Sequence, residues 1–277
     1  AFDFEWSNKN LFYGQYRRTK SYYSNSELAS RVLPDKKELE ILEPHRGKIP
    51  KEVFSRAYEP PKTDGSGKIR HNLRTATQIL RKAGWRVKDG KLIDPKSGKP
   101  LKFEILLVSP LFERIVLPFI HNLKRLGVVA HLRTVDQSQY INRIRTFDYD
   151  VITSGWGQSE SPGNEQRDFW SSAAADRFGS RNLIGIKDPV IDALIENIIT
   201  ARDRRGLVTA TRALDRVLLW RHYVIPQWHL KFDRIAYWDK FGRPTKDPKY
   251  GADFMSWWID PAKVASLDSR KKSTKQE

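Results

Sequence analysis

Three carboxylates beside a tryptophan are the residues whose types and spacing most resemble a reaction centre. Glu160, Glu165 and Asp168 lie in one polar stretch, and Trp170 follows them closely. A glycoside hydrolase needs two such carboxylates as acid and as base or nucleophile, with an aromatic platform for the sugar. Carboxylates are also common in ordinary polar loops, so a carbohydrate-active hydrolase is one hypothesis among several.

Other catalytic chemistry has no positive support in the sequence. The chain has no cysteine, which excludes disulfides, thiolate metal sites and cysteine nucleophiles. No pair of histidines has the spacing of a metal-binding motif; the six are His45, His71, His121, His131, His222 and His229. There is no GxSxG sequence, and the TDGSGK stretch lacks the spacing of a phosphate-binding loop and the strand before it. We therefore expect no catalytic residue, no metal and no cofactor.

Trp156 is the strongest candidate for contact with a ligand. Gly155 and Gly157 flank it, so its ring is expected to be uncrowded and the backbone free to approach a ligand closely. The polar residues that follow are Gln158, Ser159 and Glu160. An apolar ring beside several hydrogen-bonding groups is typical of a binding cleft rather than a reaction centre.

Alternating strands and helices are expected to position this tryptophan. Strands are predicted at 101–108, 128–135 and 147–156, separated by helices at 111–126 and 137–145, from the periodicity of their apolar residues. This order predicts an α/β fold with a parallel sheet. Ligands of such sheets bind at the carboxyl ends of the strands, and the chain leaves its third strand at that end, next to Trp156.

Further elements surround this predicted sheet. Helices are expected at 73–83, 188–201 and 205–220, the second beginning with Asp188 as a cap and Pro189 in its first turn. Asp89-Gly90 predicts a hairpin turn. The first residues have helical spacing but show no cap, which indicates either an ordinary N-terminal helix or a chain that begins inside a larger fold. Residues 17–70 are rich in Pro and Gly and predict an irregular segment.

The charge of the chain is strongly positive. Fifty Lys and Arg against 33 Asp and Glu give a net charge of +17, which favours acidic partners. The basic residues are spread over helices and loops, and the only compact block is the C-terminal SRKKSTK, expected to be a solvated tail. A basic nucleic-acid-binding domain is therefore a third hypothesis, but we expect no nucleic-acid partner.

Several unusual strings resemble a known family. AFDFEWSNKNLFYGQY, SYYSNSELA, LRKAGW, the FDYDV…GW stretch and RALDRVLLW…IPQWH are similar to extracellular solute-binding proteins of peptide ABC transporters (family 5), with the closest likeness to the YejA-like branch. The resemblance runs from residue 1 to about residue 260.

This resemblance implies a peptide-binding subunit of an ABC importer. Family members are two-lobed periplasmic proteins that close over a peptide and deliver it to an inner-membrane permease. The chain resembles their C-terminal half: a type II periplasmic-binding-protein-like lobe with an extended N-terminal segment and a returning C-terminal segment. The N-terminal half would be missing. The +17 charge is then either balanced by that half or part of a basic cleft for acidic peptides.

The resemblance also suggests how the chain is divided. Residues 1–70 would be an entry helix and an irregular wrapping segment, and 71–222 the α/β ligand-binding lobe. Residues 223–262 would return to pack on the other, absent lobe, and 263–277 would form a basic flexible tail.

Some ligand contacts follow from the resemblance as well. In relatives the tryptophan after this strand lines the peptide cleft, which gives Trp156 a stacking role. Oligopeptide-binding members place an aspartate three residues later to hold the peptide's amino terminus. Here Ser159 stands at that position, so this capture is either absent or performed by Glu160. Arg143 and Arg145 resemble basic cleft residues that meet a carboxylate, although a solvated helix face is an equal alternative. The remaining predicted ligand-binding residue is Trp170.

Overall fold

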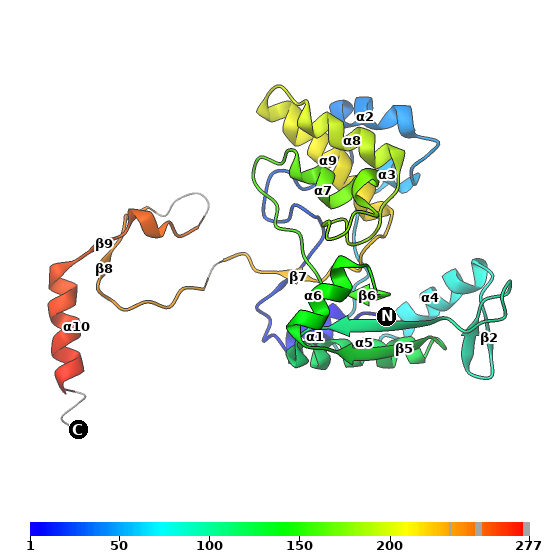
Figure 1. Ribbon diagram of the computed structural model, residues 1–277, viewed down its shortest axis with the longest axis horizontal. Helices are drawn as coiled ribbons and strands as arrows, with labels where there is room; N and C mark the ends of the chain where they lie inside the picture. The colour runs from blue at the N-terminus through cyan, green and yellow to red at the C-terminus, as the bar shows by residue number, and fades with distance from the viewer. Residues whose placement is uncertain (233, 247–250, 274–277) are drawn as a thin grey trace. The chain divides into compact units, whose positions relative to one another are not determined.

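A three-stranded parallel sheet lies in the part of the chain predicted to be α/β (Figure 1). The structure is a computed structural model that describes residues 1–232, 234–246 and 251–273. The strands have the order β5-β4-β6, with β4 (Lys102–Leu107) in the middle, β5 (Val129–Thr134) on one side and β6 (Val151–Ile152) on the other. Ile105 of β4 is the partner of Leu132 and of Val151. The predicted α/β class is confirmed.

The helices between these strands also agree with the prediction. A 3-10 turn, η2 (Pro110–Phe112), leads into α5 (Glu113–Lys124), and α6 (Gln137–Arg145) begins after its cap, Asp136. Apolar residues of α5 and β4 form a core cluster around Ile105, Leu107 and Val116. These elements bring the loop after β6 to the carboxyl edge of the sheet.

The third strand is much shorter than predicted. Residues 147–156 were expected to be extended, but β6 contains only two residues. Phe147 has a φ of 58°, and its N–H donates to the carbonyl of Ile144 while that of Asp148 donates to the carbonyl of Arg143. This pair of bonds is a Schellman motif that ends α6. The aromatic residue that favoured a strand is therefore the helix-ending residue.

A second hydrophobic core holds a group of helices together. Its helices are α2 (Lys36–Leu42), α3 (Glu52–Ser55), α7 (Glu165–Trp170), α8 (Pro189–Ile199) and α9 (Arg204–Trp220). Short 3-10 turns, η1 (Glu43–His45) and η3 (Ser172–Ala174), join them. Asp188 caps α8 by accepting from the N–H of Val190, and Asp203 caps α9 by accepting from that of Gly206. The prediction of Asp188 as a cap is confirmed.

The N-terminal helix is capped, contrary to expectation. α1 (Phe4–Asn10) begins after Asp3, whose carboxylate accepts from the N–H of Trp6 at 3.0 Å. Thr63 also donates its hydroxyl to Asp3, at 2.5 Å. Residues 17–70 contain only short elements, among them β1 (Arg17–Arg18), which pairs with β7 (Trp228–His229).

The predicted helix at 73–83 and the hairpin after it are both present. α4 (Arg70–Lys82) ends before Gly84, and β2 (Arg86–Lys88) pairs antiparallel with β3 (Lys91–Ile93). Asp89 and Gly90 both have positive φ, 50° and 73°, as the turn of a two-residue hairpin requires. Buried Leu73 and Leu92 join helix and hairpin to the C-terminal end of α5.

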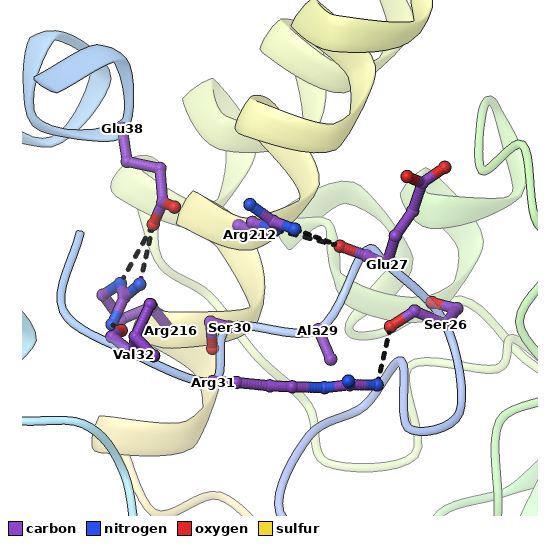
Figure 2. Close-up of a pocket in the computed structure, with 9 residues that line it drawn as sticks. All are labelled: Ser26, Glu27, Ala29, Ser30, Arg31, Val32, Glu38, Arg212 and Arg216. Carbon is purple, nitrogen blue, oxygen red and sulfur yellow. Dashed lines mark hydrogen bonds and ion pairs between the residues drawn. The ribbon is translucent and has the colours of Figure 1, made fainter. Parts of the chain in front are cut away.

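Two consecutive residues of α9 hold residues 21–38, an irregular segment of turns that leads into α2. The fully buried carboxylate of Asp215 accepts hydrogen bonds of 2.7 to 2.9 Å from the hydroxyls of Ser21 and Ser30 and from the backbone N–H groups of Tyr22 and Ser30. Arg216, also buried, forms an ion pair of 2.7 Å with Glu38 and donates to the carbonyl of Val32 (Figure 2). We refer to these contacts of Asp215 and Arg216 as the α9 clamp.

The chain divides into two units, Ala1–His229 and Leu230–Glu277. The division falls inside the predicted returning segment 223–262, because β7 pairs with β1 and so belongs to the larger unit. In the smaller unit β8 (Phe241–Gly242) pairs with β9 (Trp258–Ile259), and η4 (Phe254–Ser256) precedes β9. A Cβ atom at Gly242 would lie 2.3 Å from the indole nitrogen of Trp258, so only glycine fits there. The other predicted division points stay predictions.

The predicted tail is helical over much of its length. α10 (Pro261–Ser273) follows Asp260, whose carboxylate accepts from the N–H groups of Ala262 and Lys263. A capped start with proline in the first turn favours a helix, which the prediction of a flexible tail at 263–277 overlooked. Residues 274–277 lie outside the described residues, as do the side chains of 270–273.

The α9 clamp predicts a large effect of a small substitution. Asp215→Asn removes the negative charge. It also replaces one accepting oxygen by an amide N–H₂, which would face the hydroxyls and N–H groups that now donate to Asp215. Leaving buried hydrogen-bonding groups unsatisfied should lower the free energy of unfolding by about 3 kcal/mol. Urea unfolding followed by circular dichroism measures this value. Asp176→Asn is the matched control, because its side chain is 79% exposed and should change stability by less than about 0.5 kcal/mol. Equal stability of the two variants would contradict the role of the clamp.

Candidate functional site

A large cleft opens at the carboxyl edge of the sheet. Its volume is about 1180 Å³, and it lies within the larger unit. Its walls come from the segment 19–26, the ends of β4 and β6, the start of α5, the loop 153–160 and the stretch 219–229. The position agrees with the general rule that ligands bind beyond the carboxyl ends of parallel strands.

Trp156 lines this cleft and is fixed in place from behind. Its indole N–H donates to the carbonyl of Arg181 at 3.1 Å, and its ring centroid lies 4.8 Å from that of Trp170 and 6.1 Å from that of Tyr22. The ring is half-buried. One part of it is therefore packed on the helical core, and the exposed part is a preorganised apolar surface.

The glycines beside Trp156 leave open space. A Cβ atom added at Gly155 or Gly157 would meet nothing within 4 Å, and neither residue has positive φ. The backbone beside the tryptophan is therefore open, but the predicted uncrowded ring is not observed, because the ring packs on Trp170 and Tyr22. Gly155 lines the cleft and Gly157 does not.

Gln166 organises the loop that carries Trp156, a role that was not predicted from the sequence. Its fully buried side-chain oxygen accepts from the hydroxyl of Tyr23 at 2.7 Å and the indole N–H of Trp170 at 3.0 Å. Its nitrogen donates to the side-chain oxygens of Gln158 at 2.8 Å and of Glu165 at 3.1 Å. All four hydrogen-bonding positions of this amide are used, so the loop is held to both α7 and the clamped segment.

An aromatic cluster around Trp228 forms another wall. The ring of Trp228 lies 4.7 Å from Phe12, 6.0 Å from Tyr16, 6.5 Å from Phe2 and 6.4 Å from Phe112, the last two in stacked geometry. Trp228, Phe2 and Phe112 line the cleft. Trp228 belongs to the IPQWH string. Its neighbours in sequence did not indicate that it would line the same cleft as Trp156, more than seventy residues earlier.

Three tyrosines that line the cleft have neutral side chains whose hydroxyls are buried or bonded within the protein. Burial raises the pKa of Tyr22 and of Tyr23 well above the ordinary value, and it raises that of Tyr149 to about 12. These phenols are therefore protonated at physiological pH. Tyr149 donates to the carbonyl of Leu183 at 2.8 Å. The hydroxyl of Tyr22 is buried without a hydrogen-bond partner in the described part of the chain.

The charged residues of the cleft are acidic. Asp150, Glu160 and Asp176 line it, whereas no Lys or Arg stands among the described residues that form its walls. Asp176 forms an ion pair of 2.6 Å with Lys187, and Glu160 lies 3.6 Å from Arg204. Asp150 accepts from the backbone N–H of Glu104 and forms no ion pair with a described residue. The hypothesis that the positive charge of the chain forms a basic cleft for acidic peptides is therefore not supported by these walls.

The remaining polar residues of the Trp156 loop are partly engaged within the protein. Gln158 lines the cleft, and its side-chain nitrogen is buried without a partner among the described residues. The hydroxyl of Ser159 accepts from the N–H of Ser161 at 3.1 Å. Glu160, whose side chain is 40% exposed, is thus the carboxylate that this loop presents to the cleft.

Two predicted basic contacts point elsewhere. Arg143 forms ion pairs of 2.9 Å with Glu104 and with Asp148. Arg145 is exposed on the last turn of α6, where its carbonyl accepts from the N–H of Gly179. Neither lines the cleft. The expectation that they meet a ligand carboxylate has no support in this geometry, because the turn that ends α6 directs them away from the strand ends.

Trp170 has a different place from the one expected. Its side chain is fully buried in the helical core, and it contacts Trp156 and Tyr22 from behind. It supports the cleft wall and has no surface left for a ligand.

The three carboxylates that suggested a hydrolase are not brought together in the cleft. Glu160 lines it, but Glu165 and Asp168 do not. Glu165 accepts from the N–H of Gly163 at 2.9 Å, and Asp168 forms an ion pair with Arg177. The predicted trio, which was to supply the two carboxylates of glycoside hydrolysis, is therefore not assembled in the described walls of the cleft.

Comparisons with known proteins agree with this arrangement. Residues 1–177 match the family model described as bacterial extracellular solute-binding proteins, family 5 Middle. The chain is 48% identical over 95% of its length to a probable peptide-binding protein YejA of Agrobacterium fabrum, and 52% identical over 95% to the y4wM protein of Sinorhizobium fredii. It covers only 43% and 40% of these two proteins.

A solved structure has the same fold. The oligopeptide-binding protein AppA of Bacillus subtilis, in complex with a nonapeptide, superimposes with a TM-score of 0.64 at 17% sequence identity, over 93% of this chain and 45% of AppA. The curated relatives extend well beyond the part that this chain matches, as does AppA. The chain belongs to the bacterial extracellular solute-binding proteins of family 5.

Proposed function

We propose that this chain is the C-terminal half of a peptide-binding subunit of an ABC importer, which captures oligopeptides or peptide conjugates in the periplasm. The observation that carries the proposal is the large cleft at the carboxyl edge of the sheet, with Trp156 and Trp228 in its walls. The similarity to a probable peptide-binding protein YejA supports the same conclusion. The N-terminal half of the protein would supply the opposite wall of the cleft and would close over the ligand.

The walls suit a ligand with variable side chains. Aromatic rings offer apolar contact without a strict demand on side-chain type. Backbone groups of the loop 153–160 would hydrogen-bond the peptide main chain, as extended peptides are commonly bound. Trp156, Gly155, Gln158, Ser159 and Glu160 form this part of the proposed site. Glu160 is the candidate for holding a peptide amino group, because the hydroxyl of Ser159 is used in a turn.

The remaining partner is an inner-membrane permease, which would receive the peptide after closure.

The smaller unit exposes several large apolar side chains, including Trp238 (63%) and Trp258 (53%). We propose that its part of the returning segment, residues 230–262, packs on the absent half, which would cover such side chains.

The two alternative functions are less well supported. A hydrolase would need Glu165 or Asp168 near Glu160 in the cleft, and both are engaged elsewhere. Nucleic-acid binding would need basic residues at the site, and the described cleft walls have none.

Removal of the Trp156 ring should weaken peptide binding. We expect Trp156→Ala in the full-length protein to raise the Kd for its peptides by about tenfold or more, since buried tryptophans at binding sites often contribute at least 1.4 kcal/mol. Calorimetry with a library of short synthetic peptides measures this change. Trp156→Phe is the matched control, because it retains a ring for stacking and should lose much less affinity. Unchanged binding by a folded Trp156→Ala protein would contradict the proposed site.

The charge of the cleft predicts a preference among peptides. A lysine-containing peptide should bind more tightly than its glutamate-containing counterpart of equal length, by about tenfold at low salt, since like charges oppose association. Asp150→Asn should reduce this difference while retaining the hydrogen bond from Glu104. Asp148→Asn, which changes a carboxylate outside the cleft walls, should leave it intact. Tighter binding of the glutamate peptide would show that the absent half sets the charge preference.

A further inference from the structure

More than half of the net charge of the chain lies in residues 68–102, which include α4 and the hairpin that follows it. Residues 68–102 contain eleven Lys and Arg against two Asp, a net charge of +9 out of +17. The basic residues were expected to be scattered, because the charges are interleaved with apolar and small residues along the chain. In the structure α4 and the β2–β3 hairpin lie side by side at one end of the larger unit (Figure 1), joined by buried Leu73 and Leu92. We call residues 68–102 the basic end.

The cations of the basic end are unpaired and exposed. All eleven are exposed, and none forms an ion pair with a described residue; Glu104, two residues beyond the basic end, is paired with Arg143. Asp94 is used locally, accepting from the hydroxyl of Ser97 and the N–H of Lys96. Lys88 and Lys91 are directly opposite each other across the hairpin, an arrangement that costs stability. The charge is therefore unneutralised by the fold itself.

Apolar side chains are interspersed with these cations. Ile79 on α4 is 63% exposed and Val87 on β2 is 56% exposed, each within three residues of two basic residues. Seven of the eleven cations are lysines, which act as compact point charges rather than as bidentate forks. A spread of lysines with a few exposed apolar residues fits a surface of diffuse negative charge and an apolar interior, such as an anionic bilayer. Recognition of specific carboxylates or phosphates would favour paired arginines.

We propose that the basic end is a docking surface for anionic phospholipid headgroups, through which the protein binds the membrane surface reversibly. The proposal does not rest on peptide binding, since neither α4 nor the hairpin contributes a residue to the cleft walls. Its chemical basis is the attraction of unpaired Lys and Arg side chains to anionic headgroups, with Ile79 and Val87 positioned to enter the interface. The attraction should fall as salt screens it.

Vesicle binding tests the proposal. The full chain is mixed with phosphatidylethanolamine vesicles that contain increasing fractions of phosphatidylglycerol, or with pure phosphatidylcholine vesicles, and bound protein is measured by sedimentation. We expect binding that rises with the phosphatidylglycerol fraction, is absent from phosphatidylcholine and weakens with added salt. The triple variant Lys82→Glu, Lys88→Glu, Lys91→Glu should lower the partition coefficient by about tenfold or more.

A matched variant separates the basic end from net charge. Lys36→Glu, Lys37→Glu, Lys51→Glu alters three exposed lysines on or beside α2 and α3, which form no ion pair with described residues, and changes the net charge equally. It should bind as the unaltered protein does. The corresponding Lys→Gln triple variants give a second comparison if charge reversal impairs folding, which circular dichroism detects.

Three results would overturn the proposal. The first is no binding to phosphatidylglycerol vesicles, and the second is an equal loss of binding in both triple variants. The third is a loss, in the basic-end variant, of binding to soluble poly-glutamate or duplex DNA but not to vesicles, which would assign the basic end to an acidic protein or to nucleic acid instead.

Discussion

The buried carboxylate of Asp215 is the constraint on which the cleft depends most. It accepts four hydrogen bonds from Ser21, Tyr22 and Ser30, which fix a segment that has almost no regular secondary structure of its own. Burial raises the pKa of Asp215, with desolvation as the main cause, and the four donors act against that shift. Next to it, the ion pair of Arg216 with Glu38 fixes the following stretch. A segment rich in Ser becomes a defined wall because one helix supplies its hydrogen-bonding partners.

This constraint reaches the proposed binding surface through two short steps. Tyr22 and Tyr23, held by the clamp, contact Trp170 and Gln166 respectively. Those two residues support Trp156 and Gln158, which line the cleft. The site is therefore preorganised by a continuous set of buried contacts from α9 to the loop 153–160. Preorganisation reduces the entropy lost on binding, which suits a protein proposed to bind peptides of varied sequence.

Local signals predicted much of the fold because the interactions that set it are local. Asp188 before Pro189 marked the start of α8, and Asp89-Gly90 marked the hairpin, since caps and turns depend on neighbouring residues. The prediction of a strand that begins at Phe147 was wrong, because the αL conformation of Phe147 is set by the end of α6. Trp156 could be proposed as a cleft residue from its place after a strand. Gln166 and Trp228 could not, because their partners Tyr23 and Phe2 lie more than a hundred residues away in sequence. The ion pair of Arg143 could not be predicted either, because its partner Glu104 lies in β4, far away in sequence.

Mass spectrometry of the ligand that co-purifies with the full-length protein tests the central claim most directly. The protein would be isolated under native conditions, denatured, and the released small molecules sequenced. We expect short peptides or peptide conjugates, enriched in Lys and Arg relative to Asp and Glu, and absent from a preparation of the Trp156→Ala variant. Release of no peptide, together with no heat of binding to a peptide library, would contradict it.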